Sequence, residues 1–336
     1  MKHPSIALAM QPSRTEHVLN AEALRRLAEI GHLLDPTPLQ SFSDDRARRV
    51  LAETDILITG WGAPYIGREV LAAAPRLRLI AHAAGTVKGI VDEQIFDAGI
   101  AVTHAAEANS VPVAEFTLAT IIFAGKQVFR FRDLYVADRD RHRTHAMQRL
   151  AIGNYRRTVG IVGASRIGRR VIELLRPFEY NVLLFDPTVD VVEAKSLGTE
   201  KVDLPTLMTR SDIVSLHAPS LASTRHMIGA EELSLMKDGA TLINTARGAL
   251  IDEAALLKTL ANGKIDAIID VTDPEIPERG SAFYDLPNVF LTPHIAGAVG
   301  LERGRLGDMA IDEIERFTKG EPLRYQILRR DLALIA

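Results

Sequence analysis

The chain has 336 residues, of which 47% are hydrophobic and 25% charged, and a formal net charge of −3. This composition is typical of globular proteins, the length favours two domains, and the small net charge excludes a general attraction to nucleic acid or anionic membranes. The sequence contains no cysteine, which excludes disulfides, zinc–thiolate sites and cysteine nucleophiles.

The first ten residues contain an apolar run that Gln11 and Pro12 interrupt before it reaches the length of a signal peptide. We expect no apolar stretch of transmembrane length in the rest of the chain. These observations predict a cytoplasmic protein with no membrane partner and no nucleic-acid partner.

The first hundred residues alternate between strand-like and helix-like patterns. Apolar runs predict strands at 6–10, 55–59, 77–82 and 101–105, and an amphipathic pattern predicts a helix at 20–30. A longer helix is predicted from Pro112, a residue type favoured at the first position of a helix, to Phe131. Because its first half is apolar on more than one face, we expect it to pack inside one domain or at a subunit interface.

A second alternating series begins at Thr158. It predicts strands at 158–162, 182–185, 213–217, 240–245, 265–271 and 289–292, with helices between most of them, one of these at 169–178. Such a βαβ series implies a parallel sheet, so the chain is expected to be an α/β protein. A last helix, predicted at 300–318, is expected to leave this sheet and to return to the N-terminal domain.

A glycine-containing turn follows the first strand of this second series. It reads Gly163-Ala-Ser165-Arg-Ile-Gly168, a dinucleotide-binding fingerprint with serine in place of its middle glycine. The first glycine permits the tight turn, the middle one lets the backbone approach a pyrophosphate, and the third allows close packing of helix on strand. The Ser165 side chain intrudes on this approach, but its hydroxyl can donate to a phosphate oxygen.

Asp186 ends the next predicted strand, 18 residues after Gly168. An acidic residue at this position hydrogen-bonds the ribose hydroxyls of NAD and repels the 2′-phosphate of NADP, and no arginine directly follows to neutralise that phosphate. The sequence therefore predicts NAD as the cofactor. The alternative interpretation is that Asp186 is a turn residue before Pro187.

Arg247, Glu275 and His294 each follow a predicted strand of the second series. Ligands of an open parallel sheet bind at the carboxyl ends of its strands. An arginine there can polarise a carbonyl group, a histidine can protonate its oxygen, and a glutamate can support the histidine. Each residue alone is more often solvated or structural, and it is their common position that indicates a carbonyl-reducing site.

Other histidines have structural interpretations. His142 and His145 form a His-x-x-His pair in an arginine-rich segment, but arginines repel a cation and no acidic cluster completes a ligand set, so no metal is expected. We interpret this segment as a solvated arm at an interface. His82, His104 and His217 lie in strand-like stretches and are interpreted as structural, although His217 can also border the cofactor.

From about Leu77 to Gly297, and more loosely over the whole chain, the sequence resembles the D-isomer-specific 2-hydroxyacid dehydrogenases, which include glyoxylate/hydroxypyruvate reductases and phosphoglycerate dehydrogenases. The matching motifs occur in the family order, at 158–168, 216–219, 224–225, 243–248, 270–275 and 292–297. The resemblance implies two Rossmann-like, doubly wound parallel-sheet domains, with an NAD-binding domain (109–299) inserted into a discontinuous substrate domain (1–108 and 300–336). It also implies a homodimer formed through the NAD-binding domains.

Carried over residue by residue, the resemblance makes His294 the acid/base, Glu275 its partner, and Arg247 the ligand of the substrate carboxylate and carbonyl. It places Asp270 near the nicotinamide carboxamide. The implied contacts with NAD are Gly163, Ser165, Arg166, Ile167, Gly168, Asp186, His217, Ala218, Pro219, Thr224, Thr245, Ala246, Arg247, Asp270, His294 and Gly297. The implied contacts with the substrate are Trp61, Gly62, Ala84, Gly85, Asn109 and Arg247.

The sequence also departs from the family pattern. Ile276 stands where proline usually follows the glutamate, and Trp61-Gly62 occupies the loop in which phosphoglycerate-specific members carry an arginine. We therefore expect a small 2-oxo or 2-hydroxy acid of the glyoxylate/hydroxypyruvate type. The alternatives are a phosphoglycerate dehydrogenase and a non-enzymatic, NAD-sensing corepressor-like protein on the same scaffold. Formate dehydrogenase is disfavoured because its chemistry needs no proton donor.

Overall fold

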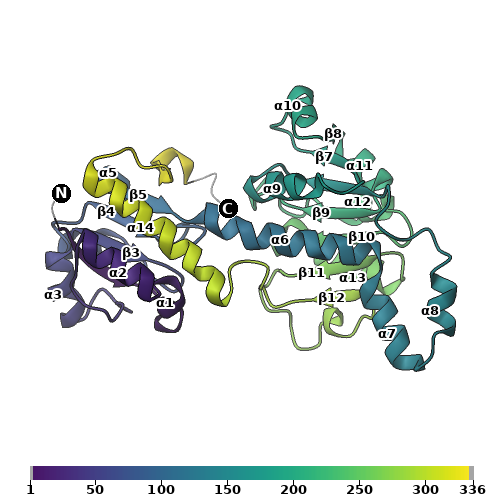
Figure 1. The fold of residues 1–336 in the computed structure, drawn as a ribbon, viewed down its shortest axis with the longest axis horizontal. Coiled ribbons are helices and arrows are strands. Elements are labelled where there is room, and N and C mark those ends of the chain that lie inside the picture. The colour runs from purple at the N-terminus through teal and green to yellow at the C-terminus, as the bar shows by residue number, and fades with distance from the viewer. Residues whose placement is uncertain (1–2, 333–336) are drawn as a thin grey trace. The chain divides into compact units, whose positions relative to one another are not determined.

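The computed structural model describes residues 3–332, and the chain divides into two compact units (Figure 1). Unit 1 comprises the chain up to Asn109 and from Ala298 onward, and unit 2 comprises Ser110–Gly297. Unit 2 is thus one continuous segment inserted between the two parts of unit 1. The sequence predicts these boundaries at 108/109 and 299/300, one and two residues from the observed positions.

Unit 1 is built on a six-stranded sheet with the order β13-β5-β4-β3-β1-β2. Neighbouring strands are parallel, except that β13 pairs antiparallel with β5. The inner strands are almost wholly buried runs of aliphatic residues, as expected for a parallel sheet covered on both faces. The strands are β1 (Ser5–Ala9), β2 (His32–Leu33), β3 (Ile56–Thr59), β4 (Leu79–His82), β5 (Ala101–His104) and β13 (Gln326–Ile327).

Helices cover both faces of this sheet because alternate residues of its strands enter two separate cores. Ile6 and Leu8 of β1 belong to one core and Ala7 and Ala9 to the other. The first core is covered by α1 (Pro12–Val18), α2 (Ala21–Ile30) and α14 (Gly304–Lys319). The second is covered by α3 (Asp45–Glu53), α4 (Arg68–Ala73) and α5 (Glu93–Asp97).

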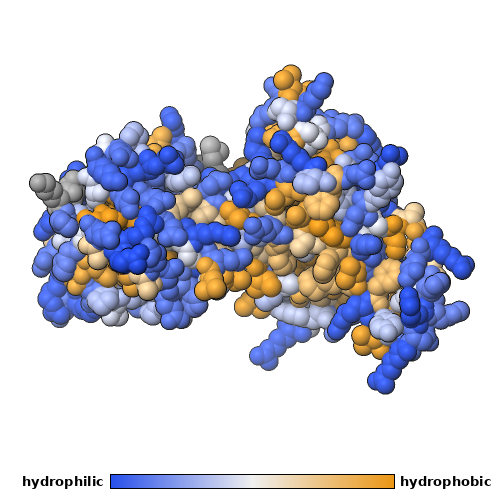
Figure 2. Space-filling view, viewed as in Figure 1, coloured by the Kyte–Doolittle hydropathy of each residue, from blue (hydrophilic) through white to orange (hydrophobic). Residues whose placement is uncertain are grey.

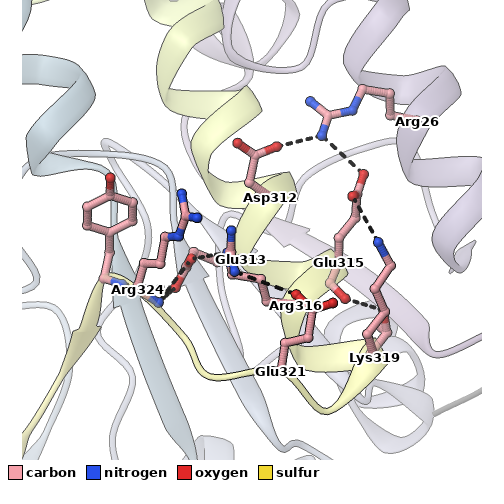
Figure 3. A network of polar contacts seen from close by, with 10 residues as sticks. Arg26, Asp312, Glu313, Glu315, Arg316, Lys319, Glu321 and Arg324 are labelled. Atoms are coloured by element: carbon pink, nitrogen blue, oxygen red, sulfur yellow. Dashed lines mark hydrogen bonds and ion pairs between the residues drawn. The ribbon is translucent and has the colours of Figure 1, made fainter.

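Polar contacts tie α14 to the rest of unit 1 (Figure 3). Arg26 of α2 bonds Asp312 at 2.6 Å and Glu315 at 3.1 Å. Glu313, which is 1% exposed, accepts hydrogen bonds from the backbone N–H groups of Arg324 and Tyr325, just before β13. A buried carboxylate is tolerated only when such donors satisfy it. These bonds fix the C-terminal helix and strand in unit 1.

Unit 2 is built on a seven-stranded, all-parallel sheet with the order β12-β11-β10-β9-β6-β7-β8. The strands are β6 (Thr158–Val162), β7 (Asn181–Phe185), β8 (Glu200–Lys201), β9 (Ile213–Leu216), β10 (Thr241–Asn244), β11 (Asp266–Ile269) and β12 (Val289–Leu291). The strand order reverses at β6, which lies between β7 and β9. The prediction of doubly wound parallel sheets is confirmed. Ligands of such sheets bind outside the carboxyl ends of the strands at the point of reversal.

Helices also cover both faces of the sheet in unit 2, around two cores. One core receives α6 (Ala106–Gly125) and α9 (Arg166–Leu175), and the other receives α11 (Leu204–Arg210), α12 (Ala230–Leu235) and α13 (Glu253–Ala261). Two further helices, α7 (Val128–Asp138) and α8 (His142–Met147), follow α6, and α10 (Val191–Ser196) follows β7. Short 3-10 turns are η1 (Gly248–Leu250), η2 (Ala282–Tyr284), η3 (Gly300–Arg303) and η4 (Arg329–Asp331).

The sequence predicts that Pro112 opens the long helix, and this is wrong. The helix is α6 (Ala106–Gly125), with Pro112 inside it. The chain enters the helix directly from β5, because Nδ1 of His104 accepts a hydrogen bond from the N–H of Ala106 at 2.9 Å. The helix also ends before the predicted Phe131, because Gln127 adopts a left-handed conformation with φ +50° and α7 begins after it.

The length of α6 corrects a second expectation. By length and composition this 20-residue helix is long and apolar enough to cross a membrane, although the sequence was expected to contain no such stretch. The predicted helix at 112–131 takes in Lys126 and Arg130, whereas α6 ends at Gly125, before these charges. In the fold, 56% of its apolar window is buried, and Ala114 and Ile121 belong to a core of unit 2. A core helix has this composition for the same reason as a membrane span, because both are surrounded by apolar groups.

Candidate active site

Gly163 and Gly168 form a turn in which side chains have no room. Gly163 follows β6 with φ +99°, a conformation that favours glycine. A Cβ atom on Gly163 would lie 2.6 Å from the backbone nitrogen of Ala218, and one on Gly168 would lie 2.1 Å from the carbonyl oxygen of Gly163. This crowding holds the start of α9 against the ends of β6 and β9, as the dinucleotide fingerprint requires.

Ser165 is the N-cap residue of α9, because its side chain accepts a hydrogen bond from the N–H of Gly168 at 3.4 Å. The prediction that this helix starts at residue 169 is therefore wrong, since the helix begins with Arg166 and Ile167. Serine is a preferred N-cap residue, so the signal was present in the sequence. The capping oxygen only accepts in this bond, which leaves the hydroxyl hydrogen able to donate to a phosphate.

Asp186 lies just past β7, and its carboxylate is held in place by three hydrogen bonds. Oδ2 accepts from the N–H of Ala164 at 2.7 Å, and Oδ1 accepts from the N–H and the hydroxyl of Thr188 at 2.8 and 2.6 Å. Burial by itself raises the pKa of Asp186, but the bonds from Thr188 and Ala164 outweigh it and lower the pKa. The group is therefore an anion beside the glycine turn. The bonds from Thr188 are the turn geometry of the alternative interpretation, and they are compatible with the predicted contact to the cofactor.

The sequence analysis did not single out Arg169, in the first turn of α9. Its positive charge helps to lower the pKa of Asp186. Its guanidinium donates to the carbonyl oxygen of Ala164 at 2.8 Å and pairs with Glu193 of α10 at 2.8 Å. Because Glu193 is 24 positions away in sequence, no local pattern could indicate this pair. The charge of Arg169 is already paired with carboxylates, so Arg169 is not a free cation for a 2′-phosphate.

The loop after β9 carries four further residues predicted to contact the cofactor. His217 is 3% exposed, and its Nε2 lies 2.9 Å from the hydroxyl of Ser215. Burial lowers the pKa of His217 to about 3, so the ring is neutral. The Thr224 hydroxyl donates to the carbonyl oxygen of Pro219 at 2.6 Å and closes the loop, while Ala218 lies against Gly163. The structure thus brings this loop to the glycine turn.

Arg247 lies between β10 and η1, and the buried Asn244 fixes its backbone. Asn244 Nδ2 donates to the carbonyl oxygen of Arg247 at 2.9 Å, and its Oδ1 accepts from the N–H of Ala246 at 3.1 Å. Burial lowers the pKa of the Arg247 guanidinium, and the charge of Glu275 opposes that shift. An arginine remains a cation under such a change. Asn244 was not among the predicted residues, although a polar residue at the end of an apolar strand could have indicated it.

His294 and Glu275 are brought together. Nδ1 of His294 is hydrogen-bonded to Oε1 of Glu275, and the two side chains are 45% and 61% exposed. With Nδ1 on the carboxylate, the other ring nitrogen, Nε2, remains for a substrate atom. His294 adopts φ +55°, which is uncommon for a residue other than glycine and is often found at functional sites.

Asp270 holds the segment that contains His294. Its Oδ1 accepts from the hydroxyl of Thr292 at 2.6 Å and from the N–H of Ile295 at 2.8 Å, and its Oδ2 accepts from the N–H of Ala296 at 2.9 Å. Its backbone carbonyl oxygen accepts from the N–H of His294 at 2.9 Å. Both carboxylate oxygens of Asp270, which is 2% exposed, are therefore engaged with this segment.

Thr245, another predicted cofactor residue, is structural in its visible contacts. The Thr245 hydroxyl bonds the hydroxyl of Thr117 in α6 at 2.9 Å, and both residues are buried. Gly297 is the last residue of unit 2. Over residues 3–332 there is no group of three or more histidine and carboxylate side chains that could hold a metal ion. His142 and His145 lie on α8 outside any such group.

The predicted substrate residues of unit 1 follow its strands. The carbonyl oxygen of Trp61 accepts a hydrogen bond from the N–H of Gln11 at 2.8 Å. Gly62 adopts φ +78°, and a Cβ atom there would lie 2.9 Å from Cβ of Gln11. The loop after β3 is thereby fixed to the start of α1.

Three further predicted residues lie close together in the same unit. The carbonyl oxygen of Ala84 accepts from the N–H of Ala105 at 2.9 Å. A Cβ atom on Gly85 would lie 3.7 Å from Nδ2 of Asn109, and Oδ1 of Asn109 accepts from the N–H of Ala298 at 3.1 Å. Unit 1 therefore assembles the loop after β4 with the first turns of α6.

Comparisons with known proteins agree with this geometry. Residues 118–296 match the family model of the D-isomer specific 2-hydroxyacid dehydrogenase, NAD binding domain. A glyoxylate reductase of Korarchaeum cryptofilum is 36% identical over 258 residues, which cover 76% of this chain and 77% of the relative. A D-3-phosphoglycerate dehydrogenase of Methanocaldococcus jannaschii is 32% identical over 306 residues, which cover 90% of this chain and 56% of the relative. The chain thus spans about half the length of that dehydrogenase.

Solved structures share the fold. A crystal structure of a Thermus thermophilus protein matches with a TM-score of 0.76 at 29% sequence identity, covering 96% of this chain and 100% of the other. The similarity therefore extends over both units.

Proposed function

Because this chain belongs to the D-isomer specific 2-hydroxyacid dehydrogenases, we propose that it is an NAD-dependent oxidoreductase that interconverts a D-2-hydroxy acid and its 2-oxo acid. The observation that carries this proposal is the hydrogen bond between His294 and Glu275 beyond the carboxyl ends of the unit 2 strands. A protein that only binds NAD has no use for an acid–base pair at this position, whereas a carbonyl reductase requires one.

His294 is the proton donor in the direction of reduction. Glu275 accepts the hydrogen bond from Nδ1–H, fixes the ring and balances the positive charge of the imidazolium. Nε2–H then donates its proton to the oxygen of the substrate carbonyl, and in oxidation the same nitrogen takes the proton back. NADH, when bound, supplies the hydride for the carbonyl carbon.

Arg247 is proposed to bind the carboxylate of the acid and to polarise its carbonyl group. A guanidinium presents paired N–H donors that match the two oxygens of a carboxylate. The partial burial of Arg247 strengthens this interaction, because water screens it less. Within unit 1, the substrate contacts implied by the family resemblance are backbone N–H groups at Ala84 and Gly85, with Asn109.

The residues of unit 2 fit NAD. Gly163 and Gly168 carry no side chains beside the start of α9, where backbone N–H groups can meet a pyrophosphate. Asp186 is a fixed anion whose carboxylate has acceptor capacity left for a ribose hydroxyl. Its charge supports NAD over NADP, and Ser165 can donate to a phosphate.

Purified protein should oxidise NADH in the presence of at least one acid from a panel of glyoxylate, hydroxypyruvate, pyruvate, oxaloacetate and 3-phosphohydroxypyruvate. His294→Gln should lower kcat by about 10²–10⁴-fold, the share of a general acid, with NADH binding unchanged. The exposed His32 offers a matched control, since His32→Gln should leave kcat unaltered. NADH binding without turnover across the panel would instead favour the corepressor-like alternative.

We also propose a homodimer in the cytoplasm, where NAD is available, formed through unit 2. α7 has no buried residue, and its Tyr135 and Val136 are 55% and 60% exposed. Phe123 of α6, whose ring contacts that of Phe129 in α7, is 45% exposed. Figure 2 shows apolar residues gathered on the surface over α6 and α7. Such a patch is stabilised by burial against a partner. Light scattering should give twice the chain mass, and Val136→Glu should favour the monomer; a monomeric unmodified protein at micromolar concentration would contradict the proposal.

A further inference from the structure

A cavity of about 480 Å³ lies within unit 2 at the amino ends of three neighbouring strands. Thr241, Asp266 and Val289, the first residues of β10, β11 and β12, line it. The residues proposed to bind NAD and to transfer the proton follow the carboxyl ends of the strands of this parallel sheet. The cavity is therefore separate from that site, and its volume lies in the range of about 300–1,000 Å³ that is usual for small-molecule sites.

The wall opposite the strands is formed by the end of α6 and the first turn of α7 (Figure 1). Phe129 of α7 stacks on Phe290 of β12, with the ring centroids 3.9 Å apart and the ring planes within 14° of each other. Val128 and Ile268 add aliphatic surface to the lining. The stack joins α7 to the edge of the sheet, so the cavity has a fixed apolar wall against which a hydrophobic group can pack.

Two acceptor groups in the lining have no donor. Within residues 3–332, the carboxylate of Asp266 makes no hydrogen bond and no ion pair. Oε1 of Gln127, which also lines the cavity, is buried and has no hydrogen-bond partner. Burial raises the pKa of Asp266, and the charge of Arg130 opposes that shift. Buried acceptors without donors are uncommon because they are costly, and a donor bound in the cavity would relieve the cost.

The charges of the lining indicate what kind of donor fits. Arg132 and Asp133 pair with each other at 2.6 Å. Arg130 and Asp266 remain, and in the described part of the chain neither forms an ion pair, although each feels the charge of the other. One unpaired charge of each sign matches a zwitterion, whereas a simple amine or a simple acid would leave one charge without a partner.

We propose that this cavity binds a free α-amino acid with an aromatic or branched aliphatic side chain. The ammonium group donates to Asp266 and to Oε1 of Gln127, and the carboxylate accepts from Arg130. The side chain of the ligand packs against Phe129 and Phe290. Arg130 is exposed and Asp266 is partly buried, so the ammonium group lies deeper than the carboxylate. The site needs neither NADH nor a 2-oxo acid, and it is independent of the proposed function.

Isothermal titration calorimetry of the full chain tests the class of ligand. L-phenylalanine and L-leucine should bind saturably. Three control compounds each lack one feature: glycine has no apolar side chain, phenethylamine has no carboxylate, and 3-phenylpropionate has no ammonium group. Each control should bind at least about tenfold more weakly than L-phenylalanine, since each loses one charged hydrogen bond or the apolar contact.

Substitutions test the location. Asp266→Asn and Arg130→Gln should each raise the Kd for L-phenylalanine by about 10- to 150-fold, the loss expected for a hydrogen bond to a charged group. The matched controls are Asp238→Asn, at an exposed carboxylate before β10, and Arg48→Gln, on the exposed surface of α3. Neither control should change the Kd. Because Arg130 is exposed, Arg130→Gln remains informative if Asp266→Asn does not fold.

Three results would overturn this inference. The first is the absence of saturable heat with both amino acids up to about 10 mM, a concentration that detects millimolar affinity. The second is an unchanged Kd in folded Asp266 and Arg130 variants. The third is a native dimer that takes up no amino acid and becomes monomeric in Asp266→Asn, which would show that a second copy fills the cavity. None of these measurements involves turnover, so this inference and the proposed function fail separately.

Discussion

Asp270→Asn is a nearly isosteric change that tests how His294 is held. In the native protein Oδ1 of Asp270 accepts two hydrogen bonds, from Thr292 and Ile295, and Oδ2 accepts one, from the N–H of Ala296 at 2.9 Å. An asparagine keeps one acceptor oxygen, which can retain the first two bonds. Its amide group then faces the N–H of Ala296, so that two donors meet at a buried position.

The size of the effect follows from these contacts. The change removes one hydrogen bond to a charged group, which contributes about 1.5–3 kcal/mol, and leaves a buried donor unsatisfied. Movement of residues 292–296 would relieve this unfavourable contact, and it would also displace His294. Since about 1.4 kcal/mol corresponds to a factor of ten, kcat should fall by about 10- to 150-fold. The carbonyl oxygen of Asp270, which accepts from the N–H of His294, is unaffected by the substitution.

Steady-state oxidation of NADH measures kcat and KM of the variant, and thermal unfolding shows whether the variant is folded. The matched control is Asp203→Asn, because Asp203 caps α11 and asparagine caps a helix equally well. We expect a lower kcat with little change in the KM for NADH. A rise in that KM with unchanged kcat would assign Asp270 to the nicotinamide carboxamide, as the family resemblance implies. Unchanged kcat and KM in a folded variant would refute the positioning role.

Three other substitutions test separate features. Glu275→Gln should lower kcat by about 10- to 150-fold, since an amide replaces the charged partner of His294; an unaltered rate would remove the carboxylate from the mechanism. Asp186→Ser should reduce the preference for NADH over NADPH in kcat/KM by about tenfold, and equal use of both cofactors by the native protein would contradict the role of this charge. Burial lowers the pKa of His82 from 6.5 to about 4. As the pH falls, this histidine is therefore protonated in the unfolded state before it is protonated in the folded state. The free energy of unfolding should decrease by roughly 3 kcal/mol between pH 6.5 and 4. His82→Asn, which retains a partner for the hydroxyl of Thr59, should remove that part of the decrease in urea unfolding; an identical pH dependence would show that His82 does not carry it.

The strands and the acid–base pair could be predicted because their signals are local. Buried parallel strands are short runs of β-branched and aliphatic residues, and their carboxyl ends share one edge of the sheet. A polar residue just after such a run is therefore placed on that edge without knowledge of the tertiary structure. Glu275 and His294 follow two neighbouring strands, β11 and β12, and the observed hydrogen bond between them is the consequence.

Two helix boundaries were missed because a local rule was applied to the wrong residue. Proline is favoured at the start of a helix, but Pro112 lies inside α6, because His104 binds the N–H of Ala106 and the helix begins there. Ser165 was interpreted as a replaced glycine whose hydroxyl can donate to a phosphate, whereas it also caps α9. In both cases a side chain that binds backbone N–H groups decided the boundary.

The contacts of Arg14 and Arg303 with the ring of Trp61, at 5.4 and 5.8 Å from its centroid, could not be predicted. Arg14, Trp61 and Arg303 are separated by 47 and 242 positions, and only the packing of α1 and α14 on the same face of the sheet brings them together. A single sequence shows which arginines lie within the loop after β3, but not which ones the fold brings to that loop.

The rim of unit 2 shows one arrangement at successive strands. At β10 and β11 a buried polar residue ends or directly follows the strand, and it fixes the backbone of a nearby reactive residue. Asn244 holds the carbonyl group of Arg247, and Asp270 holds the segment around His294. Buried polar groups are costly unless their hydrogen bonds are made, so each adopts essentially one arrangement. The exposed His294 side chain thereby receives its position from the buried Asp270, which explains how a reactive group can remain accessible and still be held in place.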